Sequence, residues 1–194
     1  GKPEEAISML DKALSLNPDG PGWYAGNLAV ARAFTGQPEE AITTLREALS
    51  LDPDNAEVPR YLSLLLYYEG KHEESLSMAR NALSLKKKTP GSMPDTEFYM
   101  TLGLSHLMME QYKKAITAFK KAINLWPDYL YAHIGLTASY SMTDRMEEAR
   151  AEAAEVLRIN PKITLEDSLK NGYFISKKAD KERFINVLRK AGLK

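Results

Sequence analysis

The sequence predicts an all-α protein, a solenoid of antiparallel helix pairs with further helices at its C-terminal end. Three observations predict this fold: one segment recurs along the chain, small residues occupy the same places in each copy, and a proline follows most copies. The opening segment GKPEEAISMLDKALSLNPDG returns as GQPEEAITTLREALSLDPDN from Gly36 onward. Such self-similarity at a fixed period is typical of helical repeat architectures.

The recurring residues define the period. The first small residues of successive copies lie 35, 34, 40 and 34 positions apart, at Ala6, Ala41, Ser75, Ala115 and Ala149. Seven positions later comes a second residue, at Ala13, Ala48, Ala82, Ala122 and Val156. Five positions further on, four of the five copies have a proline, at Pro18, Pro53, Pro127 and Pro161.

Each full copy predicts two helices. An amphipathic helix follows the turn glycine, because apolar residues such as Ala6, Leu10 and Ala13 recur at spacings of three and four. A second apolar-periodic helix lies between each proline and the next turn. The proline is expected to end one helix and to start the next in its first turn, where its missing N–H costs nothing. Gly36 and Gly70 suit a left-handed cap between the two helices of a pair.

The third full copy resembles the tetratricopeptide repeat, a helix pair of 34 residues. The residues that carry the resemblance are Leu102, Gly103, Ala115, Phe119, Ala122 and Pro127. The resemblance implies a right-handed superhelix over residues 1–161, with a half repeat at 1–20 and full repeats at 22–55, 56–89 (followed by a loop at 90–95), 96–129 and 130–161. Four residues depart from the family pattern: Arg32 replaces an aromatic residue, Lys87 replaces the proline, and Glu110 and Asp144 replace the turn glycine.

The period stops after Pro161, and residues 162–194 are expected to form capping helices. A short helix is predicted from about Leu165 and a longer one from about Ala179 to Ala191, with Gly192 as its C-cap. Phe184, Val187 and Leu188 form the apolar stripe of the longer helix. Solenoids need a terminal element to cover their last apolar face, so we expect Phe184 and Leu188 to be buried against the last repeat.

The family resemblance also implies a binding surface. In these superhelices, certain residues of the first helix of each pair line a concave groove. Transferred to this sequence, the groove positions are Trp23, Val30, Phe34, Arg60, Leu64, Tyr68, Met100, Leu104, Met108, Tyr131, Ile134 and Met142. This lining is mainly apolar, and only Arg60 resembles part of the Lys, Asn and Arg clamp that holds acidic C-termini.

We therefore expect a protein-interaction scaffold that binds an amphipathic helix or an extended apolar peptide. The partner's identity stays open, and a homodimer is one possibility. Methionine and leucine stripes at helical spacing are also typical of core, and the chain's own tail or a second copy are alternative occupants of the groove.

Composition argues against several other functions. Lysine and arginine together number 26 and so do aspartate and glutamate, so no overall field draws the chain to nucleic acid or an anionic membrane. The chain has no cysteine, and its three histidines show no metal-ligand spacing. No nucleophile or phosphate-loop motif is present in a suitable context. We expect no enzyme activity, cofactor, metal or membrane association, and a cytoplasmic location.

The tail carries a second resemblance. The segments ITLEDSLK and ADKERFINVLRKAGLK are similar to the C-terminal end of bacterial proteins that join a class III adenylate/guanylate cyclase domain to tetratricopeptide repeats. None of the catalytic motifs of that domain occurs here, so the resemblance implies the regulatory or dimerising, non-catalytic part of a signalling protein. Gly1 aligns with the turn glycines Gly36 and Gly70, so we also expect the chain to be a fragment whose first helix is missing.

Overall fold

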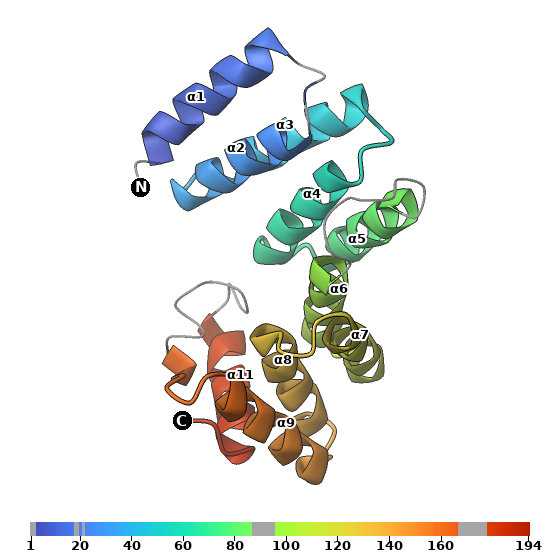
Figure 1. Cartoon of the computed structure of the whole chain (residues 1–194), viewed down its shortest axis with the longest axis vertical. Coiled ribbons are helices and arrows are strands. Elements are labelled where there is room, and N and C mark those ends of the chain that lie inside the picture. Colours follow the sequence, from blue (N-terminus) through green and yellow to red (C-terminus); the bar gives the residue numbers. More distant parts are fainter. Residues whose placement is uncertain (1–2, 18–19, 21, 87–95, 167–177) are drawn as a thin grey trace. The chain divides into compact units, whose positions relative to one another are not determined.

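The computed structural model describes residues 3–17, 20, 22–86, 96–166 and 178–194. Over these residues the secondary structure is helical and contains no strand (Figure 1). The helices are α1 (Pro3–Leu16), α2 (Gly22–Phe34), α3 (Pro38–Leu51), α4 (Glu57–Tyr68), α5 (His72–Lys86), α6 (Thr96–Met108), α7 (Tyr112–Leu125), α8 (Leu130–Ser141), α9 (Met146–Ile159) and α11 (Lys178–Lys190). The prediction of an all-α chain of paired helices is confirmed.

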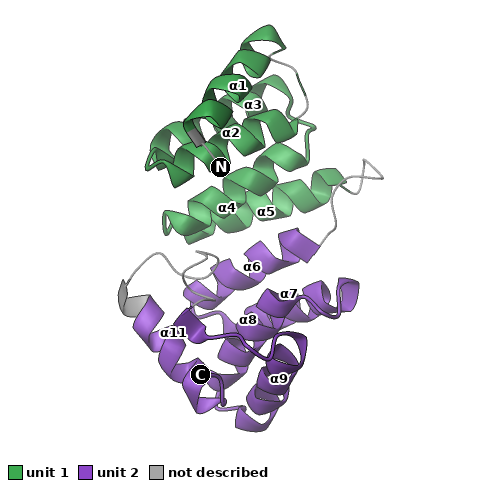
Figure 2. Cartoon of the chain, turned by 60° about the vertical axis from the view of Figure 1, so that its left-hand side comes forward, with its two compact units in different colours: residues 1–93 green, residues 94–194 purple. Residues whose placement is uncertain are grey.

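The chain divides into two compact units, residues 1–93 (unit 1) and 94–194 (unit 2), which Figure 2 shows in green and purple. The division falls after the second full repeat. The tail helix α11 therefore belongs to the same unit as the last two repeats. The expected loop at 90–95, and most of the short helix expected from Leu165, lie outside the described residues.

Unit 1 is built from the pairs α2–α3 and α4–α5, with α1 packed on α2. Small residues on α2 and α3 allow the close approach, since Ala25, Ala29 and Ala41 are almost fully buried. Leu45 of α3 and Leu62 of α4 complete the centre of the core. Arg32 takes the place of a packed aromatic residue by joining three helices: it donates to Asp11 of α1 at 2.9 Å and to the hydroxyl of Thr44 of α3.

Unit 2 is built from the pairs α6–α7 and α8–α9, and α11 packs on α8. The centre of this unit is Phe119 of α7, whose side chain is fully buried. A β-carbon built on Gly103 or on Gly135 would lie only 2.5 Å from the Phe119 ring. The ring is thus enclosed by α6 on one side and α8 on the other, and both glycines are required for this packing.

The same type of turn joins the two helices of every pair, and one residue in it has positive φ. In unit 1 that residue is Gly36 or Gly70, and in unit 2 it is Glu110 (φ 57°) or Asp144 (φ 55°). In each case the next residue donates its N–H to the carbonyl five positions earlier, which satisfies the end of the first helix. These bonds are Gln37 to Arg32, Lys71 to Leu66, Gln111 to His106 and Arg145 to Tyr140. The sequence prediction of a left-handed cap here is correct, and it extends to the two copies that lack glycine.

We expect Asp144→Gly to stabilise unit 2 by about 1 kcal/mol, because glycine adopts positive φ without the steric cost of a β-carbon. For a chain of this length that gain raises the melting temperature by about 2–4 °C. Calorimetry would measure it, with Asp144→Ala as the matched control that keeps the β-carbon. Equal melting temperatures for the two variants would contradict the explanation.

The prolines act differently from the expectation. Pro53 and Pro127 lie in the turns and not in the first turn of α4 or α8, which begin at Glu57 and Leu130. Their effect is on the preceding residue, because proline disfavours helical backbone there. The residues before Pro53, Pro127 and Pro161 all have φ between −129° and −140° and ψ between 83° and 94°, as at Asp52, Trp126 and Asn160. The proline slot therefore ends the second helix of a pair.

Candidate functional site

One face of α2 carries exposed aromatic side chains. Trp23, Val30 and Phe34 are seven and four positions apart, so they share a face of the helix. Trp23 is 47% exposed and Phe34 is 85% exposed, whereas Val30 is half-buried. We call these three residues the α2 face. It is accessible because the core side of α2 is made by Ala25, Leu28 and Ala29.

The groove positions of α4 are less accessible. Leu64 and Tyr68 are half-buried, and Arg60 is only 7% exposed. The guanidinium of Arg60 donates to Glu57 at 3.1 Å and lies 3.9 Å from the centre of the Tyr61 ring. Arg60 is therefore paired only through Nε, and its Nη2 is buried without a hydrogen-bond partner among the described residues. Because the side chain is buried, it is not presented at the surface as a cation for a partner's carboxylate.

The groove positions of unit 2 divide into buried and half-buried residues. Met100, Leu104 and Ile134 are at most 2% exposed, so they are core side chains in the structure. The half-buried positions are Met108, Tyr131 and Met142. Nearly every residue of α6 and α8 is buried, so the 3.6-residue period that separates a lining position from a core position is absent there.

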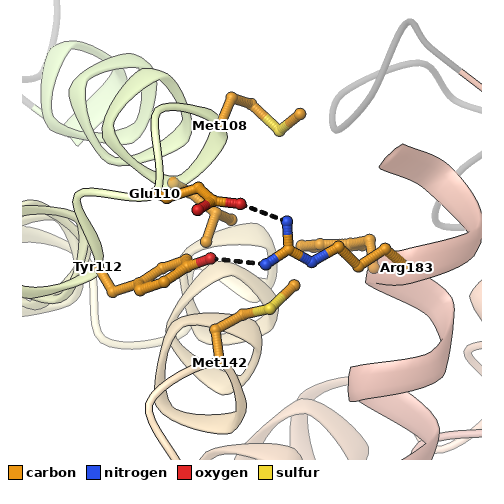
Figure 3. A pocket seen from close by; sticks show the side chains of 7 residues that line it. Met108, Glu110, Tyr112, Met142 and Arg183 are labelled. Carbon is orange, nitrogen blue, oxygen red and sulfur yellow. Dashed lines mark hydrogen bonds and ion pairs between the residues drawn. The ribbon is translucent and has the colours of Figure 1, made fainter. Parts of the chain in front are cut away.

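The helix α11 shares the lining of a small cavity with two of these groove positions, Met108 and Met142. The cavity, about 70 Å³ in volume, is lined by residues of α6, the α6–α7 turn, α7, the end of α8, and α11; they are Leu107, Met108, Glu110, Tyr112, Met142, Arg183 and Phe184 (Figure 3). From α11, Arg183 donates to Glu110 at 2.5 Å and to the Tyr112 hydroxyl at 2.9 Å. Phe184 beside it is 3% exposed, and Leu188 one turn further on is fully buried.

Sequence reasoning named Met108 and Met142 but missed Glu110, Tyr112 and Arg183 as contact residues. One signal was present, since Glu110 stands where the repeat favours glycine. A side chain at that position has a backbone cost, and here its carboxylate meets a cation from a distant part of the chain.

Comparison with known proteins gives the family. The profile of the tetratricopeptide repeat matches residues 1–65 and 106–166, which together are more than half of the chain. The chain belongs to the tetratricopeptide-repeat family. No curated protein matches the sequence.

Solved structures show the same fold as this tetratricopeptide-repeat protein. PilW, described as a widely conserved type IV pilus biogenesis factor, is similar with a TM-score of 0.77 and 16% identity over 97% of this chain and 81% of its own. PilF of Pseudomonas aeruginosa has a TM-score of 0.74 and 22% identity over 97% of this chain and 82% of its own. YrrB, described as having an unusual peptide-binding site, has a TM-score of 0.64 and 20% identity over 94% of this chain and 90% of its own.

The described part of this tetratricopeptide-repeat protein shows little that suggests chemistry. No group of three or more histidine, cysteine, aspartate or glutamate side chains is placed there to hold a metal ion. None of the helices described is both long and apolar enough to cross a membrane. His106 and His133 are both buried, and each has a partner: His106 pairs with Gln111 at 3.0 Å, and His133 pairs with Glu152 at 2.7 Å and with the Pro127 carbonyl at 2.8 Å.

The environment of His133 predicts a pH-dependent stability. Burial alone would lower the pKa of His133, but the hydrogen bonds with Glu152 and the Pro127 carbonyl, together with the charges of Glu152 and Glu155, raise it above its ordinary value of 6.5. The protonated form is thus favoured in the folded state. The resulting stabilisation is complete below pH 6.5, the value in the unfolded chain, and is lost as the pH rises through the raised pKa of the folded protein.

We expect Glu152→Gln to remove most of this pH dependence. Urea denaturation at pH 6 and pH 8.5 would measure it in the parent and the variant. The neutral amide keeps the size of the side chain and removes the charge. The assignment to His133 would be contradicted if the free energy of unfolding changed by the same amount between pH 6 and pH 8.5 in both proteins.

Proposed function

We propose that this chain is a protein-interaction scaffold and that the α2 face binds an apolar or amphipathic peptide. The observation that carries the proposal is the exposure of Trp23 and Phe34 on one face of α2. Large aromatic side chains exposed together commonly mark a binding surface. Tetratricopeptide-repeat proteins are in general non-catalytic scaffolds, and the peptide-binding site named for YrrB supports the same class of partner.

The size of the side chains suggests moderate affinity. A tryptophan or phenylalanine buries about 150–250 Å² in a full contact, and apolar burial contributes about 25 cal/mol per Å². Ordering of the peptide offsets part of that gain, so we expect dissociation constants on the order of micromolar. Because the contacts are apolar, affinity should change little between low and high salt, whereas binding to a cationic clamp would weaken with salt.

Selection from a peptide library on the full chain tests the proposal. Trp23→Ser and Phe34→Ser should each weaken the selected binders at least about tenfold, since aromatic anchors dominate such interfaces. Leu51→Ser is the matched control, because Leu51 is an exposed apolar residue of the same unit on α3, outside the α2 face. Phe34 and Leu51 are more than half exposed, so their variants should stay within about 0.5 kcal/mol of the parent in stability. Trp23 also contacts the Tyr24 ring, with 4.2 Å between the ring centres, so its variant should lose more.

Binders that tolerate both serine variants, or that lose affinity equally with Leu51→Ser, would overturn the proposal.

A second candidate rests on the tail sequence. Its similarity to the end of cyclases with tetratricopeptide repeats favours the non-catalytic part of a signalling protein. The gene sequence before Gly1 tests this, since a class III cyclase domain encoded there would favour the second candidate. Cytoplasmic location, homodimer formation and the capping role of residues 162–194 stay predictions.

A further inference from the structure

The helix α11 lines a small cavity together with two residues that the repeat pattern assigns to the groove, Met108 and Met142. It packs on α8, the first helix of the last pair, and reaches the turn between α6 and α7. Met108 and Met142 occupy the same place in their repeats as Phe34 does in its repeat in unit 1. Phe34 is exposed, whereas Met108 and Met142 are half-buried and line one cavity with Phe184 of α11.

The contact has the composition of a peptide interface. Two apolar residues of α11, Phe184 and Leu188, are buried one turn apart, and Arg183 adds a paired hydrogen bond at the edge. Figure 3 shows Arg183 extending from α11 between Met108 and Met142 towards Glu110 and Tyr112. Methionine side chains adapt their shape to different apolar partners, so this surface suits more than one helix.

The polar part of the contact is weak enough to be exchanged. Arg183 is 52% exposed and Glu110 is 60% exposed, and ion pairs in such settings are worth about 0.2–1 kcal/mol. A helix of 13 residues is marginal in water without a surface to pack on. The buried side chains of Phe184 and Leu188 supply most of the contact, and the covalent attachment of α11 adds a local concentration on the order of millimolar.

We propose that this face of unit 2 is a helix-binding site and that α11 is its tethered occupant. The proposal rests on the proposed scaffold function and names a second surface and the chemistry of its partner. That partner is an amphipathic helix with arginine followed directly by an aromatic residue and, four positions later, by leucine. This pattern is the one that Arg183, Phe184 and Leu188 present to the site.

A labelled synthetic peptide of residues 178–194 tests the proposal by fluorescence anisotropy on full-length variants. The parent chain should bind it weakly, because its own α11 competes. In Arg183→Glu the internal ion pair is lost and Glu110 repels the new carboxylate, while the peptide keeps its arginine, so the peptide should bind roughly two- to thirtyfold more tightly. Lys190→Glu is the matched control, since Lys190 is an exposed basic residue of α11 outside the contact; its affinity should equal that of the parent.

The charge-swapped variant Glu110→Arg with Arg183→Glu provides the second arm. Its internal pair is restored and its site repels the arginine of the peptide, so binding should return to the parent level or below. Equal affinity for the parent and Arg183→Glu, or tight binding by the swapped variant, would overturn the proposal. Trp23→Ser and Phe34→Ser should leave this exchange unchanged, so failure of the α2 face and failure of the α11 site give different results.

Discussion

Phe119→Ala should lower the free energy of unfolding of unit 2 by about 3–5 kcal/mol, the range for a fully buried phenylalanine. The side chain is completely buried and its ring is enclosed by Gly103 and Gly135. Removing it leaves a cavity among α6, α7 and α8 that rigid helices cannot close. Urea denaturation followed by Trp126 fluorescence, in a Trp23→Phe background, would measure the loss in unit 2.

Gly135→Ala supplies the control for this explanation, because whether it destabilises or stabilises unit 2 depends on the presence of Phe119. In the parent chain the new methyl group would meet the ring at 2.5 Å, and overpacking of this kind costs about 1–3 kcal/mol. In the Phe119→Ala background the clash is gone, and alanine is favoured over glycine within a helix by about 1 kcal/mol. The substitution should then stabilise. Additive effects of the two changes would show that the ring and the glycine do not pack as described.

Phe184→Ala should weaken the docking of α11 by about 3–5 kcal/mol, since Phe184 is 3% exposed. We expect hydrogen exchange of residues 181–190 to quicken strongly. Exchange in α9, which belongs to the last repeat itself, should change less. Ile185→Ala is the control on the same helix, because Ile185 is only half-buried and its substitution should weaken the docking of α11 less.

Unchanged exchange in α11 after Phe184→Ala would contradict its docking through this residue. A loss of protection spread equally over α8, α9 and α11 would instead favour the tail as an integral cap of the last repeat. Both results are readable from one exchange experiment.

The helix pairs were predictable because most of the same local signals recur in each copy of the repeat. Small residues at two fixed places, a left-handed turn and a proline all act over a few neighbouring residues, so their spacing alone located the helices. Even the glycine replacements Glu110 and Asp144 keep the positive φ of the turn. The proline ends the second helix of a pair, as expected, but it does not start the next helix.

The surface was less predictable because it depends on packing between distant segments. Phe34 and Met108 hold the same place in the repeat, yet only Phe34 is widely exposed. Met108 lines a cavity with Arg183 and Phe184 of α11, about 75 residues further along the chain, and local periodicity does not detect such a neighbour. For the same reason the pairing of Arg183 with Glu110 could not be derived from the repeat pattern.

Substitutions in the left-handed turn between paired helices can change which partners this architecture binds. Its central residue stands at the tip of a hairpin, outside the packed faces, so exchanging it alters the surface while the helices keep their positions. Glycine there contributes nothing to recognition, whereas a carboxylate such as that of Glu110 can select a basic partner for a backbone cost of about 1–2 kcal/mol. An array of such turns can therefore diversify one repeat at a time without redesign of its core.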